Sequence, residues 1–382
     1  MEPFVPVTSA VQNPSAAHKS PPALRPSAQA VPPHAAPAVN PDRITHPRLT
    51  LHGVNHTLHP VNTQAVVFEE PLRLSLRELT LVDATDADVL VQMRWSGIST
   101  GTERMLWTGT MPPFPGLGYP LVPGYEGVGE IVVAGPDSGR ELGQLVYIAG
   151  SRGFTDARGL FGGQASMVVV PGTKTVVLNP QLGEQGALFA LAATAHNALC
   201  ATAPGISPRD VLDQLPELIV GHGALGRLIA RLVVLYGGKA PTVWEINPVR
   251  VDGARGYHVV HPDSDPRRDY RTICEVSGTN GLWDTLIARM APGGEICLAG
   301  FYSEPVSFTF PPAFMRQTRF RIAAQWKESD LRTIAELANS GALSLDGLIT
   351  NREPVSRAAD AYSTAFGDPH CVKMILDWRT AA

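Results

Sequence analysis

Between residues 62 and 180, apolar and polar positions form short runs with the two-residue alternation of β-strands. Short turns separate these runs, and we expect no helix among them. Short strands at such close spacing predict a compact, β-rich, barrel-like domain. The predicted strands span residues 65–69, 74–79, 89–95, 127–134, 145–149 and 166–170.

From residue 218 onward, strand-like runs alternate with helical stretches, the clearest helix being 281–290. This alternation is typical of a doubly wound parallel sheet, so the pattern predicts the α/β class with a six-stranded sheet. A helix over 184–200 precedes this half. Two helices (330–340 and 356–366) and a strand (372–378) end the chain and could fold back onto the first domain. The six predicted strands are 218–220, 243–246, 258–260, 272–276, 295–299 and 320–325.

The start of the chain differs from the rest. It is rich in proline and alanine, and its only aromatic residue is Phe4. A segment without periodic apolar residues cannot offset its own ordering entropy, which predicts a disordered tail. An upstream start codon, with the working protein beginning near Val61, is the alternative. The predicted organisation is a tail (1–61), a β-rich catalytic domain (62–190), a nucleotide-binding domain (191–326) and a return segment (327–382).

The central motif is Leu-Ile-Val-Gly-His-Gly-Ala-Leu-Gly at residues 218–226, where a strand-like run enters the GxGxxG spacing. Gly221 would allow a tight turn, Gly223 a close approach by a pyrophosphate, and Gly226 the packing of helix on strand. The anion would then lie at the N-terminus of the following helix. In a chain with 36 glycines this spacing could arise by chance, so the neighbouring residues decide whether it is a nucleotide-binding motif. A second strand-like run ends in Glu245, about 20 residues on, where the ribose hydroxyls would lie.

These residues predict an NAD site. A Glu245 carboxylate would accept hydrogen bonds from the adenosine ribose and would repel the 2′-phosphate of NADP. Arg250 is a complication, because an arginine at that offset could face a phosphate. His222 lies inside the turn, where it would line the phosphate. A glycine-rich turn without a ligand is the alternative. The predicted cofactor residues are Gly221, His222, Gly223, Ala224, Leu225, Gly226, Glu245, Arg250, Ser277 and Gly300.

Composition excludes several classes of function. A net charge of only -4 offers no electrostatic basis for binding nucleic acid or an anionic membrane. No apolar run approaches the roughly 18 residues of a membrane span. The four cysteines (Cys200, Cys274, Cys297 and Cys371) are far apart, which argues against a zinc ribbon, a redox dithiol or a disulfide framework. The expected location is a reducing cytoplasm.

Several motifs together carry a resemblance to a known family. Residues 124–130 read Gly-Tyr-Glu-Gly-Val-Gly-Glu, and residues 292–294 read Pro-Gly-Gly before the fifth strand of the predicted sheet. With the glycine turn and the order of domains, they resemble the medium-chain dehydrogenase/reductase family over residues 63–378. This resemblance implies a GroES-like catalytic domain, a Rossmann domain and hydride transfer between an alcohol and a nicotinamide cofactor.

Three longer runs, at residues 95–103, 107–115 and 158–163, resemble the members of that family that act in bacteriochlorophyll synthesis. The resemblance implies that the substrate is a bacteriochlorophyllide, a chlorin-type tetrapyrrole, whose 3-(1-hydroxyethyl) group is oxidised to 3-acetyl. A flat pigment needs a wide apolar cleft, and several aromatic residues could either line it or form the core. They are Trp95, Trp107, Phe114, Tyr119 and Phe154.

The loop over residues 111–120 is rich in proline and glycine, which suits a preformed wall. Its apolar surface would also permit transient contact with a pigment-bearing membrane. Assembly as a homodimer is left open at this stage.

The sequence departs from the family where many members bind a catalytic zinc ion. Ser99 stands at the position of the cysteine ligand, Tyr125 at that of the histidine, and the third position falls near Ala190. The four closely spaced cysteines that carry a structural zinc in relatives are missing too. Glu103 and Glu126 are nearby carboxylates, and two carboxylates alone make a poor zinc site. We therefore expect no metal.

Without a metal, another group must take the hydroxyl proton as hydride leaves. A positioned general base or relay is worth roughly 10²–10⁴-fold in rate. The candidates are Ser99, Thr102, Tyr125 and Glu126, with Tyr125 requiring a lowered pKa if it is to act as a base. Each has a structural alternative: a pocket wall for Tyr125, a structural hydrogen bond for Glu126, and turn closure for Ser99 and Thr102. His196 is expected to be a packed histidine.

Two other functions compete with this hypothesis. One is a zinc-free quinone or enoyl reductase of the same family, which would prefer NADPH, a preference that Glu245 opposes. The other is a non-catalytic chlorin carrier that keeps the nucleotide fold for binding only.

Overall fold

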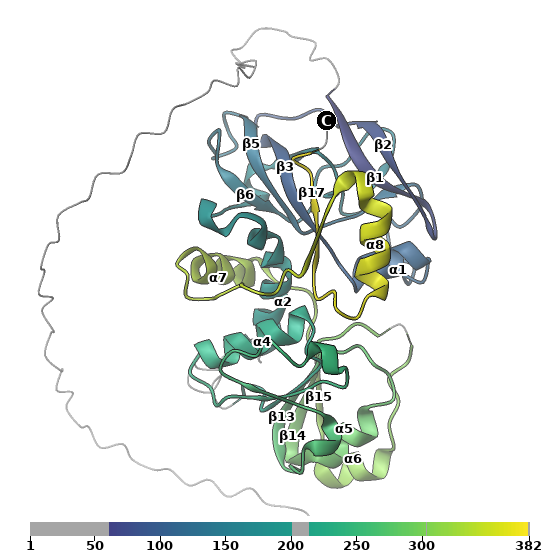
Figure 1. Ribbon diagram of the computed structural model, residues 1–382, viewed down its shortest axis with the longest axis vertical. Helices are drawn as coiled ribbons and strands as arrows, with labels where there is room; N and C mark the ends of the chain where they lie inside the picture. The colour runs from purple at the N-terminus through teal and green to yellow at the C-terminus, as the bar shows by residue number, and fades with distance from the viewer. Residues whose placement is uncertain (1–60, 201–213, 303, 381–382) are drawn as a thin grey trace, which may run out of the picture. The chain divides into compact units, whose positions relative to one another are not determined.

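The computed structural model describes residues 61–200, 214–302 and 304–380. Residues 1–60, which make up nearly all of the predicted tail, lie outside the described part. Within it, the chain forms a β-rich part and a parallel-sheet part. Figure 1 draws the β-rich part in purple to teal, with its last strands in yellow, and the parallel-sheet part in green.

The β-rich part contains two sheets. The smaller has the order β2-β1-β4-β7, and its β1 and β2 form an antiparallel pair. The larger has the order β16-β17-β3-β5-β6-β9, with β8 also paired to β3. The strands of the smaller sheet are β1 (Asn62–Glu70), β2 (Arg73–Thr80), β4 (Leu121–Val122) and β7 (Arg158–Gly159). Those of the larger are β3 (Asp88–Ile98), β5 (Gly127–Ala134), β6 (Leu145–Ile148), β8 (Met167–Pro171), β9 (Thr175–Val177), β16 (Asn351–Pro354) and β17 (Met374–Asp377).

The end of the chain completes the larger sheet. Strand β17 runs antiparallel to β3, with Ile375 opposite Gly97 and Met374 opposite Ile98. Strands more than 270 positions apart in sequence therefore share one ladder, which places the last strand directly beside the segment that leads to Ser99.

The second sheet is parallel throughout and has six strands in the order β12-β11-β10-β13-β14-β15. This confirms the predicted α/β class and the doubly wound Rossmann sheet. The strand order reverses between β10 and β13, and in such sheets ligands bind beyond the carboxyl ends of the strands at that point. The strands are β10 (Leu218–Val220), β11 (Thr242–Trp244), β12 (His258–Val260), β13 (Tyr270–Glu275), β14 (Met290–Leu298) and β15 (Arg319–Ile322).

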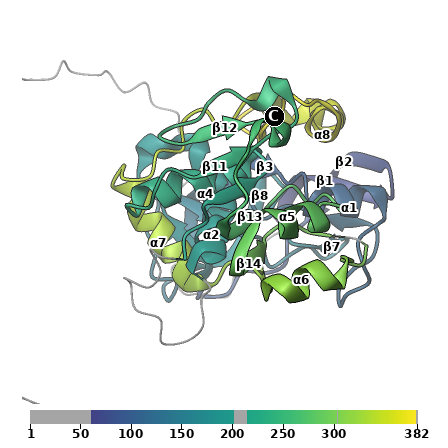
Figure 2. The same ribbon diagram turned by 90° about the horizontal axis from the view of Figure 1, so that it is seen from below.

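Helix α4 follows the glycine turn and packs on α2, which also contacts α7 (Figure 2). It buries Leu228, Ile229, Leu232 and Val233, which recur at helical spacing on one face. Helices α5 and α6 lie against β14. The helices are α1 (Thr102–Thr108), α2 (Phe189–Cys200), α4 (Ala224–Leu235), α5 (Trp283–Arg289), α6 (Phe310–Arg316), α7 (Glu328–Asn339) and α8 (Ala358–Gly367).

The secondary structure differs from the prediction in two places that bear on the site. The expectation of no helix between residues 62 and 180 is wrong, because α1 lies there; it is only seven residues long and ends at Gly109 in a left-handed conformation. Its buried residues are Glu103 and Leu106, one of them an acid, so no apolar stripe marks this helix in the sequence. The predicted helix over 184–200 begins as 3₁₀ turns over Pro180–Leu188, where Gly183 departs from helical geometry, and α2 starts only at Phe189.

None of the described helices combines the length and the apolar character that crossing a bilayer requires. None of the four cysteines, all of which lie in the described part of the chain, forms a disulfide bond.

Candidate active site

The glycine turn has the geometry that its spacing predicts. Gly221 has a φ of +109°, and a Cβ on it would lie 3.2 Å from the backbone of Ser277. A Cβ on Gly226 would lie 1.9 Å from the Gly221 carbonyl oxygen, so the start of α4 packs directly on the turn. A Cβ on Gly223 would meet nothing within 4 Å. The space beside Gly223 and the first N–H groups of α4 is therefore open to an anion.

The Glu245 carboxylate lies beside this turn. Its Oε2 accepts a hydrogen bond from the His222 backbone N–H at 3.1 Å, and its Oε1 accepts one from the Asn247 N–H at 2.8 Å. Each carboxylate oxygen can accept a second hydrogen bond. The side chain is held where it could still bind two ribose hydroxyls.

Ser277 and Gly300 lie at the same edge of the sheet. The Ser277 N–H donates to the buried Glu275 carboxylate at 2.7 Å, and the Gly300 N–H donates to the Glu275 carbonyl at 3.1 Å. Ala224 and Leu225 form the first turn of α4. The carboxyl ends of neighbouring parallel strands thus bring these predicted residues to the glycine turn.

Two predicted cofactor residues have side chains engaged elsewhere. The His222 ring is buried, with Nδ1 2.6 Å from the Arg250 carbonyl and Nε2 2.8 Å from the Tyr257 hydroxyl, and burial lowers its pKa to about 4. Only its backbone belongs to the turn, so the ring does not line a phosphate site. The Arg250 guanidinium donates to the carbonyls of Pro369, at 2.7 Å, and Cys371, at 3.4 Å. It is directed to the return segment, because those carbonyls supply its hydrogen-bond acceptors.

Three predicted catalytic residues form one cluster of hydroxyl groups. Ser99 follows β3, Thr102 begins α1, and Tyr125 precedes β5. The Ser99 Oγ and Tyr125 oxygen are 2.6 Å apart, and the Tyr125 hydroxyl donates to Thr102 Oγ1 at 3.3 Å. Because Tyr125 has one proton, Ser99 must then donate to Tyr125. The lone pairs of Ser99 Oγ remain available to accept a proton from an alcohol.

The surroundings of Tyr125 oppose its ionisation. Burial raises the pKa of its phenol above the usual range, and the carboxylates of Glu126 and Glu103 raise it further. A lowered pKa, which a tyrosinate base requires, is therefore the reverse of what this environment produces. The geometry suits a neutral hydroxyl that passes a proton along the cluster.

The fourth predicted residue, Glu126, lies outside this cluster. Its Oε2 accepts a hydrogen bond from the Lys373 ammonium, which also donates to the Ile98 carbonyl at 3.0 Å. Both side chains are buried, and burial raises the pKa of Glu126 while Lys373 opposes that rise. Within the described part of the chain, Glu126 Oε1 has no hydrogen-bond partner.

A second buried carboxylate, Glu103, lies on α1. It accepts hydrogen bonds from the Tyr362 hydroxyl and, at 3.3 Å, from the Ser99 N–H. Burial raises its pKa to about 8, so its carboxyl group is mostly protonated at neutral pH. Glu103 therefore fixes the backbone at Ser99 without adding a full charge there.

Sequence reasoning missed Lys373 and Tyr362 because both lie in the return segment, more than 230 residues from their partners. The residues around Lys373 do indicate that its side chain is unusual. It interrupts an otherwise apolar run, Val372 to Leu376, which predicts either an edge strand or a buried, paired cation.

Most of the aromatic residues predicted as cleft wall or core belong to the core. Trp107, Tyr119 and Phe154 pack in the hydrophobic core of the β-rich part. Trp95 packs against a second hydrophobic core, which includes residues of α2. Phe114 is exposed.

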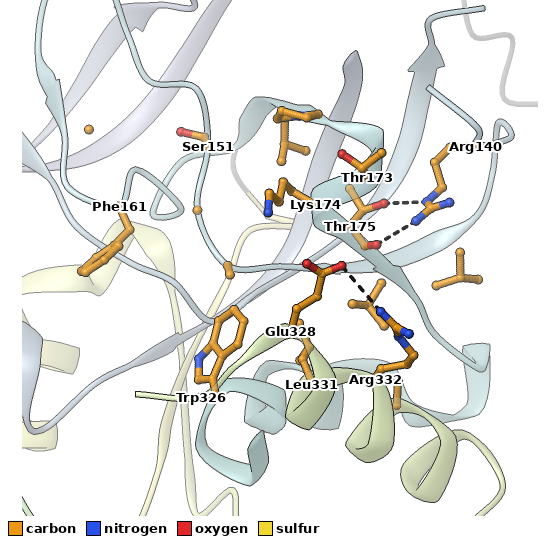
Figure 3. A pocket seen from close by; sticks show the side chains of 18 of the residues that line it. Arg140, Ser151, Phe161, Thr173, Lys174, Thr175, Trp326, Glu328, Leu331 and Arg332 are labelled. Carbon is orange, nitrogen blue, oxygen red and sulfur yellow. Dashed lines mark hydrogen bonds and ion pairs between the residues drawn. The ribbon is translucent and has the colours of Figure 1, made fainter. Parts of the chain in front are cut away.

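A different aromatic residue, Phe161, lies edge-on against Tyr125, with ring centroids 5.1 Å apart. It lines a cavity of about 650 Å³, shown in Figure 3, between residues 140–177 of the β-rich part and residues 326–335 around the start of α7.

His196 belongs to a separate cluster. Its Nδ1 lies 2.7 Å from Asp330 Oδ1, and Asn197 donates to the other oxygen of the same carboxylate at 3.0 Å. This contact joins α2 to α7, in keeping with a packed histidine.

The groups at the zinc-ligand positions of the family do not suit that metal. Ser99 and Tyr125 supply hydroxyls bonded to each other, and the nearby carboxylates are bonded to Tyr362 and Lys373. Structural and catalytic zinc sites use thiolate, imidazole and free carboxylate ligands. No group of three or more His, Cys, Asp and Glu side chains suited to a metal occurs among the described residues.

Comparison with known proteins gives consistent results. Residues 85–181 match the family model of the alcohol dehydrogenase GroES-like domain. The chain is 53% identical over 322 residues to the 2-desacetyl-2-hydroxyethyl bacteriochlorophyllide A dehydrogenase of Rhodobacter capsulatus, covering 84% of this chain and 100% of the relative. It is 51% identical to the protein of the same name from Cereibacter sphaeroides, with the same coverage.

Solved structures of dehydrogenases share the fold. An alcohol dehydrogenase from Escherichia coli CFT073, complexed with NADH, superposes with a TM-score of 0.68 at 19% identity, covering 83% of this chain and 99% of that one.

The two glycines of the turn should respond differently to alanine. Gly223→Ala should leave the melting temperature nearly unchanged but weaken NAD binding by about tenfold or more, because the new methyl group occupies the open space. Gly226→Ala should destabilise the fold by about 1–3 kcal/mol, since its methyl group meets a backbone oxygen. Thermal unfolding and calorimetric titration with NAD measure both effects. A stable Gly226→Ala variant, or unchanged NAD affinity in Gly223→Ala, would contradict this account.

Glu103 should make stability depend on pH. Its folded pKa of about 8 lies above the ordinary value of 4.5, so its contribution is complete below pH 4.5 and is lost as pH rises towards 8. Relative to Glu103→Gln, the wild type should therefore lose stability over that window, by ~2–4 kcal/mol. Urea unfolding at several pH values measures the difference, with the exposed Glu336→Gln as control. Parallel pH profiles for the wild type and Glu103→Gln would refute the assignment.

Proposed function

Since the chain belongs to the family of 2-desacetyl-2-hydroxyethyl bacteriochlorophyllide A dehydrogenases, within the medium-chain dehydrogenase/reductases, we propose that it oxidises the hydroxyethyl side chain of a bacteriochlorophyllide to an acetyl group. The position numbered 2 in the relatives' name is position 3 in the other numbering of the macrocycle. The observation that carries the proposal is 53% identity over the full length of a relative with that name. The chain is an alcohol dehydrogenase, an oxidoreductase that acts on CH–OH.

The proposed cofactor is NAD, which would accept a hydride from the alcohol carbon. The open space beside Gly223 and the N-terminus of α4 would hold its pyrophosphate. The Glu245 carboxylate would bind the adenosine ribose and would repel a 2′-phosphate. Arg250 does not oppose this preference, because its guanidinium is bonded to the return segment.

The reaction is proposed to proceed without zinc, through the hydroxyl cluster. Loss of hydride from a secondary alcohol leaves a protonated ketone unless the O–H proton departs as well. The Ser99 Oγ is free to accept that proton while it passes its own to Tyr125, and Tyr125 in turn passes one to Thr102. Thr102 is partly exposed, so the last proton can reach solvent. No member of this relay has to carry a lasting charge.

Glu103 and Glu126 are positioning residues in this scheme. Glu103 holds the Ser99 backbone, and the pair of Glu126 with Lys373 fixes the segment that carries Tyr125. Geometry of this kind matters because a proton moves efficiently only between hydroxyls at hydrogen-bond distance.

The edge of the parallel sheet supports assembly as a homodimer. Strand β15 is one of the two outer strands of the described sheet, and Ile322 on it is 77% exposed. Phe310, Phe314 and Met315 on α6 are also largely exposed. An unpaired edge strand beside exposed apolar side chains favours pairing with a second copy about a twofold axis.

The central test combines turnover, metal analysis and one substitution. Purified protein, NAD and the hydroxyethyl bacteriochlorophyllide should yield NADH and the acetyl pigment, whose absorption is shifted to the red. Activity should survive a zinc chelator.

Tyr125→Phe should lower kcat by roughly 10²-fold with NAD affinity unchanged, because it interrupts the relay. Tyr119→Phe, which loses a hydroxyl bonded to the Leu106 carbonyl, is the matched control. Stoichiometric zinc whose removal abolishes activity would refute the zinc-free mechanism, and an unaffected Tyr125→Phe would refute the relay.

Analytical ultracentrifugation tests the dimer. The wild type should sediment as a dimer at micromolar concentration, and Ile322→Lys should shift it towards monomer, because a charge would be buried at the edge. Leu142→Lys, at a residue 66% exposed in the β-rich part, should not. A monomeric wild type would contradict the assignment.

A further inference from the structure

We propose that the cavity beside Phe161 binds the macrocycle of the pigment and that the Lys174 ammonium is the counter-ion of the pigment's free carboxylate. This inference rests on the proposed function. A bacteriochlorophyllide differs from the esterified pigment in its free propionic acid group, so an enzyme that acts on it gains selectivity from a cation placed to meet that group.

The cavity has the size and lining that a flat, mostly apolar ligand needs. Its volume of about 650 Å³ lies within the usual range for small-molecule sites. Leu160, Val170 and Leu331 supply aliphatic walls, while Phe161 and Trp326 supply aromatic ones. Aromatic side chains pack well against the face or edge of an extended π-system.

The cavity adjoins the reacting groups. Phe161 contacts Tyr125, so the same ring that lines the cavity also lies against the hydroxyl cluster. Its backbone is fixed, because the Phe161 carbonyl accepts a hydrogen bond from the Ser151 N–H at 2.9 Å and Ser151 lines the cavity too. A macrocycle bound there can present a side chain at its rim to Tyr125 and Ser99.

Two of the three cations around the cavity are engaged by the protein itself. The Arg140 guanidinium donates to the side chain and the carbonyl of Thr175 at 2.7 and 2.9 Å. Arg332 lies 3.8 Å from the Glu328 carboxylate. Lys174 forms no hydrogen bond or ion pair through its ammonium anywhere in the described chain.

The position of Lys174 is set by its backbone. It ends a short 3₁₀ turn, Gly172–Lys174, which is closed by a hydrogen bond from Thr175 Oγ1 to the Gly172 carbonyl at 2.8 Å. Figure 3 shows Lys174 and Glu328 directed into the same space from opposite walls. An anionic ligand would be attracted by Lys174 and repelled by Glu328, so the two side chains should have opposite effects on its affinity.

The test compares two pigments, the hydroxyethyl bacteriochlorophyllide as its free acid and as its methyl ester. The wild type should favour the acid. Lys174→Gln should raise KM for the acid by about 5- to 10-fold with kcat nearly unchanged, because the carboxylate contact is equally present before and during the reaction. KM for the ester should not change, and Lys174→Arg should restore the preference. Added salt should reduce the wild-type preference, since the pair is partly exposed.

Two further variants complete the design. Glu328→Gln should lower KM for the acid alone, and Lys239→Gln, which removes an exposed lysine outside the cavity, should change neither KM. An unchanged acid-to-ester ratio in Lys174→Gln, with normal wild-type turnover, would overturn this assignment and leave the proposed function intact. Failure of the wild type to oxidise either pigment with NAD would overturn the proposed function, and this assignment with it.

Discussion

The arrangement of the proposed reaction site depends on one buried ion pair, between Glu126 and Lys373. Neither side chain has appreciable contact with solvent, so each charge needs the other to offset the cost of leaving water. The pair joins the segment that carries Tyr125 to the last strand of the chain. A Cβ on Gly97 would lie 2.2 Å from Glu126 Oε2, so the glycine leaves room for the pair on the strand between them. The position of Tyr125 in the hydroxyl cluster therefore depends on this ion pair.

In the proposed mechanism, weak acids take the place of strong metal ligands. In that proposal, Ser99, Thr102 and Tyr125 exchange protons with an alcohol without any of them ionising, and burial together with the Glu126 carboxylate makes an anionic tyrosine unfavourable. A neutral relay avoids placing a lasting charge in a poorly solvated site. It also demands accurate positioning, because a neutral hydroxyl is a far weaker base than a metal-bound alkoxide or an imidazole.

Sequence alone predicted the parallel sheet and the glycine turn, because both are local: strand, turn and helix are contiguous, and each glycine has its own steric reason. Glu245 was predictable for the same reason, since one strand fixes its distance from the turn. The side-chain directions of His222 and Arg250 were not, because they depend on Tyr257 and on carbonyls of the return segment. Tyr362 and Lys373 escaped prediction because their partners lie far away in sequence. Helix α1 escaped prediction because one of its two buried residues is an acid, and the contact of Phe161 with Tyr125 escaped it because this contact joins separate segments of the chain.

The place of β17 in the larger sheet has a consequence for biosynthesis. The partners of Ser96, Gly97 and Ile98 on that edge are translated more than 270 residues after them. Until residues 373–377 emerge from the ribosome, Glu126 lacks its cation and this edge of β3 is unpaired, so the β-rich part cannot complete its native ladder before β17 has been synthesised. A nascent chain that stalls before residue 373 would leave one edge of β3 unpaired and Glu126 without its cation. Chaperones and proteases recognise such incompletely folded chains. Pairing of β17 with β3 is thus also the step that brings Lys373 to Glu126.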